Sequence, residues 1–135
     1  MAGETDLARL IADMEPRLRA GEWVFCTIPG AAYGDRRELG PVAAVVEDEG
    51  LTLVVERERA EKAGLEYEGV FRMITLQVQS SLAAVGLTAA VSGRLAELGI
   101  GANLIAGYHH DHALVPCERA DEAVRALERL AEGGR

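Results

Sequence analysis

The sequence predicts an α+β protein of two related halves, in which antiparallel sheets carry helices on one face. Three observations lead to this expectation. Hydrophobic residues make up 49% of the 135 residues, which is enough for a packed core. Stretches with strand periodicity alternate along the chain with stretches of helical periodicity. The second half in particular follows the order strand, helix, strand, strand, helix.

The first expected element is an amphipathic helix over residues 6–18, with Thr5 as its N-cap. Its apolar stripe consists of Leu7, Leu10, Ile11, Met14 and Leu18. Pro16 should kink or end this helix early, because proline lacks the amide hydrogen that an interior helical residue donates.

Strand patterns follow in the rest of the first half. Residues 23–28 are rich in β-branched and aromatic side chains and end at Pro29-Gly30, which is typical of a strand closed by a turn. Residues 31–40 are polar and predict a loop. Residues 43–47 and 51–55 flank an acidic, glycine-containing turn and predict a β-hairpin. Residues 56–63 have helical composition, and Gly64 should stop that helix.

The second half opens with a predicted half-buried strand over residues 70–79. Ile74, Leu76 and Val78 share one face of it, and Thr75, Gln77 and Gln79 share the other. A helix is then indicated by apolar residues at helical spacing, with Gly99 as its stop signal. These residues are Leu87, Val91, Leu95 and Leu98.

Two short strands and a helix complete the chain. Residues 102–106 and 113–115 predict strands on either side of a polar interruption at residues 107–111. The last helix is marked by the stripe Ala120, Ala123, Val124, Leu127 and Leu130. With one further strand from the first half, this order completes a ferredoxin-like βαββαβ unit. We therefore expect halves at residues 1–66 and 67–135 that share one compact core.

Charge and cysteine content narrow the classes of partner and compartment. The net charge of −8 repels phosphate backbones and anionic lipids, so we expect neither nucleic acid nor a membrane as partner. Cys26 and Cys117 have no CxxC spacing and predict reduced thiols in a cytoplasmic protein. The N-terminal residues lack the pattern of a signal peptide.

The connection after the predicted strand at 70–79 is a candidate ligand site. Ser80 and Ser81, followed by Gly86, predict a strand-to-helix connection with free backbone N–H groups at the start of a helix. Such a site suits a carboxylate, because both the donors and the helix dipole favour an anion. The alternative is that one serine only caps the helix.

The segment from Tyr108 to His112 is the second candidate. Asp111 could accept a hydrogen bond from an ammonium group, so that with the connection it would recognise an α-amino acid. Three imidazoles and a carboxylate could instead hold a metal ion. In an extended strand, however, His110 and His112 share one face while His109 and Asp111 share the other, which leaves two ligands on each. A polar hairpin tip remains a third interpretation.

Signals for catalysis are weak. The sequence has no GxSxG nucleophile elbow, no HExxH pattern and no glycine-rich phosphate loop. Nothing in the spacing places a base beside a nucleophile. We therefore expect no enzymatic activity and no cofactor.

Residues 73–116 carry a resemblance to a known family. The matching pieces are Ile74-Thr75-Leu76, Ser80-Ser81-Leu82, the run from Ala84 to Thr88, and His110-Asp111-His112 before Val115-Pro116. The run from Trp23 to Cys26 with Pro29-Gly30 agrees as well. The chain thereby resembles a small bacterial family of ACT-domain-containing proteins, which is similar to the ACT modules of aspartate kinases and of an animal arginine sensor.

The resemblance implies two ACT-like halves and a regulatory function. Such modules bind an amino acid at an interface between ACT units and transmit its presence to a partner or to their own oligomer. Carried over by position, the ligand residues would be Ser80, Ser81, Val85, Gly86 and Asp111, to which we add the neighbouring His110 and His112. His109 stands where the resemblance leads us to expect an aromatic residue. A homodimer is implied, and a purely structural dimerisation module is the other alternative beside the metal site.

Overall fold

The computed structural model describes residues 6–79, 81 and 85–133. The chain divides into two compact units, one of residues 1–20 and 72–135 and the other of residues 21–71. Each unit has its own hydrophobic core. Across the described residues, no helix is long and apolar enough to cross a membrane.

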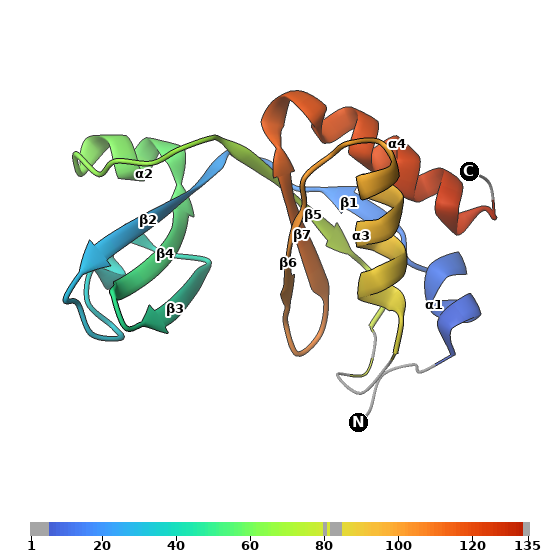
Figure 1. Cartoon of the computed structure of the whole chain (residues 1–135), viewed down its shortest axis with the longest axis horizontal. Coiled ribbons are helices and arrows are strands. Elements are labelled where there is room, and N and C mark those ends of the chain that lie inside the picture. The colour runs from blue at the N-terminus through green and yellow to red at the C-terminus, as the bar shows by residue number, and fades with distance from the viewer. Residues whose placement is uncertain (1–5, 80, 82–84, 134–135) are drawn as a thin grey trace. The chain divides into compact units, whose positions relative to one another are not determined.

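The first unit is a four-stranded sheet with helices on one face (Figure 1). Its strands are β1 (Pro16–Leu18), β5 (Phe71–Leu76), β6 (Asn103–Ala106) and β7 (Asp111–Pro116), in the spatial order β1-β5-β7-β6. The helices are α1 (Leu7–Ala12), α3 (Leu87–Glu97) and α4 (Ala120–Ala131), and a 3-10 turn, η2 (Cys117–Arg119), precedes α4. From β5 to α4 the order is βαββα, and β1 supplies the remaining strand of the ferredoxin-like unit.

The core of this unit fixes which face of the sheet meets the helices. Ile74 and Leu76 of β5 and Ala113 and Val115 of β7 belong to one apolar cluster with residues of α3 and α4. Their alternate neighbours on the same strands, among them Thr75 and His112, are not part of that cluster and point to the other face. The sheet of the first unit therefore has a helix-covered face and a helix-free face.

The second unit is built on a three-stranded antiparallel sheet. Its strands are β2 (Trp23–Pro29), β3 (Ala43–Glu47) and β4 (Gly50–Glu56), in the order β3-β4-β2. A 3-10 turn, η1 (Arg37–Leu39), lies in the loop after β2, and α2 (Arg57–Lys62) follows β4 directly. The core packs Val24 and Cys26 of β2 against Leu51, Leu53 and Val55 of β4.

The α+β class with ferredoxin-like, ACT-like βαββαβ halves, antiparallel sheets and helices on one face is confirmed. The hairpin at β3 and β4, the helix α2 and the order of the second half also agree with the expectation. The strand expected over 70–79 ends at Leu76, and the strand expected at 113–115 begins already at Asp111. The polar residues Asp111 and His112 are therefore part of β7.

The single helix expected over residues 6–18 is wrong. Helix α1 ends at Ala12, and residues 16–18 form β1, which pairs with β5. The physical reason lies at Pro16, since proline cannot donate the helical hydrogen bond and excludes the preceding residue from helical backbone angles. Glu15 has a φ of 42°, which lies outside the right-handed helical region, so the helix cannot continue through this residue. The N-cap is Asp6, whose carboxylate accepts a hydrogen bond from the backbone N–H of Arg9 at 3.1 Å, while the expected cap Thr5 lies outside the described residues.

The compact units also follow a different division from the expected halves at 1–66 and 67–135. Residues 1–20 group with residues 72–135 because β1 joins the β5 edge and because Leu10 and Met14 are fully buried in the first unit's core. The buried side chains form one cluster in each unit. The division into halves at residues 1–66 and 67–135 with a shared core stays a prediction.

Candidate functional site

The connection from β5 to α3 ends at Gly86. This residue is the N-cap of α3 and has a φ of 101°, a backbone conformation that side chains disfavour. A Cβ atom at this position would lie 2.9 Å from the Cδ2 atom of Leu7, so α1 closely approaches the start of α3. Val85 is 82% exposed and Ser81 is half-buried, whereas Ser80 lies outside the described residues. Glycine supplies no side chain to cap α3, so its first backbone N–H groups need other partners.

The second predicted segment forms the hairpin between β6 and β7. Ile105 faces His112 and Ala106 faces Asp111 across the two strands. The backbone N–H of Gly107 donates to the carbonyl oxygen of His110 at 2.9 Å and closes the turn. A side chain at position 107 would collide with that same oxygen, because its Cβ would lie 2.9 Å away.

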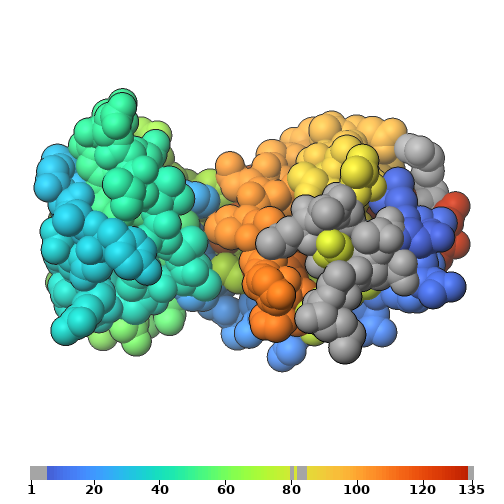
Figure 2. Space-filling model, turned by 90° about the horizontal axis from the view of Figure 1, so that it is seen from below, coloured from blue at the N-terminus to red at the C-terminus, as the bar shows by residue number. Residues whose placement is uncertain are grey.

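Two side-chain contacts bring the connection and the hairpin together. The Nε2 atom of Gln79, just after β5, lies 3.2 Å from Nδ1 of His109 in the turn. The hydroxyl oxygen of Thr75 lies 2.9 Å from Nδ1 of His112. Figure 2 shows the orange hairpin beside the yellow start of α3. The structure thus places the two predicted segments at the same end of the first unit's sheet.

The alternation of β7 separates the predicted residues of the hairpin. Alternate residues of a strand point to the same face of its sheet. Ala113 and Val115 of β7 face the helices, so Asp111, two residues before Ala113, lies on the side of α3 as well. His112 lies on the helix-free face with Thr75. His110 is half-buried and lies in the turn between β6 and β7. Asp111 therefore shares its face with the connection, and His112 does not.

His112 is held in a polar network that spans three neighbouring strands. Thr75 is 2% exposed and accepts a long hydrogen bond of 3.4 Å from the guanidinium of Arg19, which follows β1. Burial lowers the pKa of His112, and the charges of His110 and Arg19 lower it further, while Asp111 acts in the opposite direction. The imidazole is accordingly neutral near pH 7.

Sequence reasoning missed Thr75, Gln79 and Arg19 as parts of this region. The alternation of the strand did indicate that Thr75 and Gln79 share a face, but it could not show which residues face them from other strands. Arg19 was missed because the residues just before it were assigned to a helix instead of to β1.

The residues predicted for a histidine metal site do not converge on one point in the described part of the chain. Nδ1 of His109 is hydrogen-bonded to Gln79 and Nδ1 of His112 to Thr75, so the two rings face different neighbours, and Asp111 lies on the other face of the sheet from His112. Among the residues that the structure describes, no three His, Cys, Asp or Glu side chains are grouped so as to hold a metal ion.

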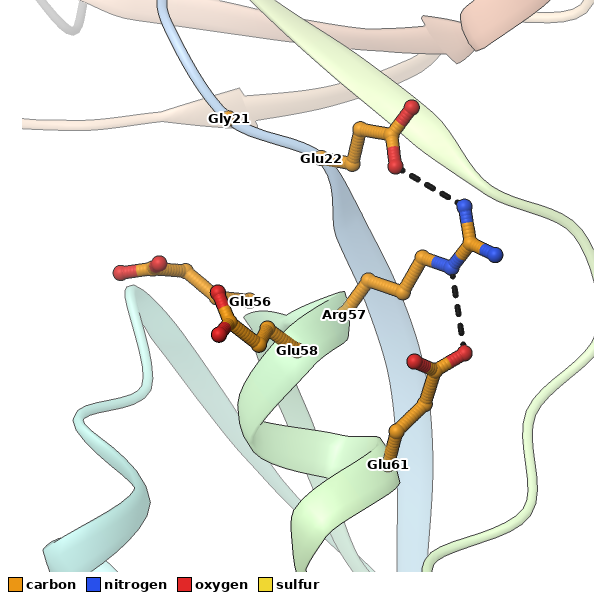
Figure 3. A pocket seen from close by; sticks show the side chains of 6 residues that line it. All are labelled: Gly21, Glu22, Glu56, Arg57, Glu58 and Glu61. Carbon is orange, nitrogen blue, oxygen red and sulfur yellow. Dashed lines mark hydrogen bonds and ion pairs between the residues drawn. The ribbon is translucent and has the colours of Figure 1, made fainter.

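The second unit contains an acidic pocket of about 380 Å³ (Figure 3). Arg57 lies between Glu22 and Glu61, with ion pairs of 2.9 and 3.2 Å, while Glu56 and Glu58 point away from it. The hydroxyl of Tyr67 donates to Glu61 at 2.5 Å. This bond and Arg57 lower the pKa of Glu61, and the same carboxylate raises the pKa of Tyr67. The one arginine of the pocket is therefore already paired, and the network holds α2 to the start of β2.

Another pocket of the second unit has a volume of about 430 Å³ and a more apolar lining. Loop residues 33–42 form one wall, and Ala43 and Ala44 of β3 with Leu53 of β4 form the other. Tyr33 at its rim is 77% exposed. Neither pocket includes a residue that the sequence predicted for a ligand.

Family models described as ACT domains match residues 2–72 and residues 68–129 of the chain. A search of curated proteins gave no match. One solved structure that is similar over nearly the whole chain comes from Vibrio cholerae and is described as a protein of unknown function and possible transport protein. It is 52% identical, with a TM-score of 0.84, and the match covers 93% of this chain and 95% of that one.

More distant structures share the fold. A protein of Agrobacterium tumefaciens is 17% identical with a TM-score of 0.71, and the match covers 86% of this chain and 87% of that one. The regulatory subunit of aspartate kinase from Thermus flavus is 14% identical with a TM-score of 0.63, and the match covers 86% of this chain and 96% of the subunit. The family models divide the sequence near residue 70, although the compact units group residues 1–20 with residues 72–135.

Proposed function

The chain belongs to the ACT domain family, and from this membership we propose that it is a regulatory module that binds an α-amino acid and catalyses no reaction itself. The observation that carries the proposal is the juxtaposition of the β5–α3 connection with the hairpin, which the Gln79–His109 contact holds together. Membership of the family suggests a regulatory ligand. The contact between Gln79 and His109 suggests that the ligand binds between the β5–α3 connection and the hairpin.

The proposed site lies on the helix-covered side of the first unit. The ligand carboxylate would accept from the first backbone N–H groups of α3, after Gly86, and the predicted residue Ser81 precedes them in the chain. Asp111 would accept from the ligand ammonium group on the same side of the sheet. Val85 and His110 flank these groups, whereas His112 points to the helix-free face and is left out of the proposed contacts.

We further propose that the protein acts as a homodimer in the cytoplasm. Strand β3 is at the edge of its sheet, and Val45 and Val46 on it are 54% and 63% exposed. An exposed apolar edge strand favours pairing with a second copy, because its backbone groups lack strand partners on one side. Cys26 and Cys117, the two cysteines of the chain, are not joined by a disulfide bond, which suits a reducing compartment.

The first test is the melting temperature of the purified protein in the presence of each of the twenty amino acids. A ligand at a hundred times its dissociation constant adds about 2.7 kcal/mol to the free energy of unfolding. For a chain of this size, the melting temperature should rise by about 5–10 °C. We expect one or two amino acids to give such a rise.

A pair of matched variants locates the site. Asp111→Asn removes the charge but keeps the shape, and it should abolish the response to the amino acid. Asp48→Asn makes the same change at the turn of the other hairpin, in the second unit, and should leave the response intact. An unresponsive panel with a dimeric protein would favour the structural dimerisation module instead. A melting temperature that falls with chelator would revive the histidine metal site.

A further inference from the structure

The imidazole of His112, near the start of β7, contacts two other parts of the first unit. Its Nδ1 atom lies 2.9 Å from the hydroxyl oxygen of Thr75 on β5, a residue that is 2% exposed. On the hairpin side, Nε2 and Cδ2 of the ring would lie 3.6 and 3.9 Å from a Cβ atom at Gly107, so the ring lies against that residue. The half-buried ring therefore connects β5 with the turn at residues 107–110.

A second imidazole contact lies at the tip of the same hairpin. Nδ1 of His109 is 3.2 Å from Nε2 of Gln79, just after β5. His109 is exposed, whereas His112 is half-buried, so the contact of His112 is the better shielded from water. Asp111, which the proposed amino-acid site requires, lies between these two histidines in the chain. A movement of the turn away from β5 would therefore move Asp111 as well.

A proton on His112 would add a cation where one is already present. The guanidinium of Arg19 donates to the hydroxyl of Thr75 at 3.4 Å. A protonated imidazole donates from both ring nitrogens, so Arg19 and His112 would direct two cationic donors at one hydroxyl oxygen. Burial lowers the pKa of His112, the charges of His110 and Arg19 lower it further, and Asp111 raises it. The held position of the ring therefore favours its neutral form.

The strand positions beside the ring give a protonated His112 no carboxylate on its own face, within the described residues. Ile105 of β6 is the residue opposite His112, and Arg17 of β1 is the residue opposite Thr75. Asp111 points to the other face of the sheet. A partly buried charge without an ion-pair partner is more stable in water. Protonation therefore favours a state in which the ring has left its place beside β5.

We propose that His112 is a pH-sensitive switch, in which the neutral ring holds the turn of the β6–β7 hairpin against β5 and the protonated ring releases it. The pKa of His112 is lower in the held state than in the released state, so release becomes more favourable as the pH falls below about 6.5. Release would also withdraw Asp111 from the side of α3 and weaken amino-acid binding. This last step rests on the function proposed above, whereas the switch itself does not.

Hydrogen exchange tests the switch without any ligand. The backbone amides of residues 106–112 are followed at about pH 8 and about pH 5, on either side of the histidine range, and corrected for the intrinsic exchange rate. Each unit by which the held state lowers the pKa of His112 should raise the opening constant up to about tenfold at the lower pH. NMR titration of the ring gives that pKa independently, so the two measurements must agree.

The amide of Leu95 separates local release from global unfolding. Leu95 is fully buried in the core of the first unit, and its amide should exchange only when the whole unit unfolds. The hairpin amides should exchange faster than this amide. Their exchange should also be insensitive to low concentrations of denaturant, as expected for a local opening.

Variants assign the pH dependence to one ring. His112→Asn keeps a polar atom near the place of Nδ1 but cannot take up a proton, so its hairpin exchange should be nearly the same at both pH values. His110→Asn is the matched control in the turn. Its pH dependence should remain, with a midpoint at higher pH, because the charge of His110 lowers the pKa of His112. Arg19→Met should raise the midpoint for the same reason, whereas Arg125→Met, at an exposed position of α4, should leave it unchanged.

The effect on ligand binding is measured by repeating the amino-acid panel at both pH values. The rise in melting temperature should be smaller at the lower pH in the wild-type protein and should be retained in His112→Asn. A panel without any response, beside pH-dependent exchange of the hairpin, would overturn the amino-acid function and leave the switch in place.

Three results would overturn the switch. They are hairpin exchange that is the same at both pH values in the wild-type protein, a pH dependence that persists in His112→Asn, and a midpoint that Arg19→Met leaves unchanged.

Discussion

Replacing Gly86 by alanine should destabilise the protein at the start of α3. The residue has a φ of 101°, and its Cβ would lie 2.9 Å from Cδ2 of Leu7. A non-glycine residue in such a backbone conformation costs about 1–3 kcal/mol. Leu7 is 37% exposed, so its side chain can rotate away and adds little to that cost. We therefore expect the free energy of unfolding to fall by about 2 kcal/mol.

Thermal unfolding followed by circular dichroism measures this change. For a chain of this size, a loss of about 2 kcal/mol lowers the melting temperature by about 5–10 °C. Gly93→Ala is the matched control in the same helix. Gly93 is an exposed, interior residue of α3, and nothing lies within 4 Å of its Cβ position. Alanine there should stabilise the protein by about 0.5–1 kcal/mol, because it improves helix propensity.

A double variant separates the two costs at Gly86. If the close approach of Leu7 were the main cost, Leu7→Ala would restore most of the stability of Gly86→Ala. We expect little recovery, since backbone strain dominates. A melting temperature of Gly86→Ala equal to that of the wild type would refute the reasoning. It would show that α3 can start without a positive φ at this position.

Three further outcomes follow from the structure. Gly50→Ala should cost more than Gly86→Ala in thermal unfolding, because its Cβ would lie 2.6 Å from the rigid carbonyl oxygen of Ile28; equal losses would contradict this. Leu95→Ala should cost about 2–5 kcal/mol in denaturant unfolding, since Leu95 is fully buried in the first unit's core, and a loss under 1 kcal/mol would mean that the core repacks. Tyr67→Phe should raise the pKa of Glu61 in an NMR titration, because the Tyr67 hydroxyl bond is the largest cause of its depression; an unchanged pKa would assign the depression to Arg57.

Much of the fold could be predicted from the sequence because its periodicities are local. The helical stripe at α3 reflects one buried face, and helix α3 is followed by Gly99, whose φ of 71° suits glycine. The strand β5 was expected to be half-buried, but it is a central strand of the sheet, and Thr75 is as buried as Ile74 and Leu76. The hairpin at β3 and β4 follows from the acidic turn residues Asp48 and Glu49 and from Gly50, which opens β4 directly after them. These signals need no knowledge of which elements later become neighbours.

The misses all depend on tertiary contacts. Met14 and Leu18 have helical spacing, yet both pack against the first unit's core, Met14 after the end of α1 and Leu18 from β1. Spacing could not distinguish these two geometries, and only Pro16 pointed to the second. The site shows the same limit. The alternation places Asp111 and His112 on opposite faces, but only the sheet order shows that one faces the helices and the other faces Thr75 and Arg19.

The role of residues 1–20 leads to a last prediction, that residues 67–135 alone will not form a stable domain. The family models divide the sequence near residue 70, which suggests a self-sufficient second half. That half lacks β1, so the outer edge of β5 loses its partner. It also lacks Leu10 and Met14, both with 0% exposure in the core. Burial of two such side chains contributes about 3–6 kcal/mol, which is comparable with the whole stability of a small domain.

Circular dichroism and sedimentation decide the point. The fragment of residues 67–135 should show no cooperative thermal transition, or should aggregate through the exposed edge of β5. Joining residues 1–20 to residues 71–135 through a short flexible linker should restore the transition, since that chain contains every element of the first unit. A cooperative, monomeric transition of the fragment alone would contradict the prediction. The domain would then follow the division of the family models, and the N-terminal helix and β1 would be additions to a sheet that is stable without them.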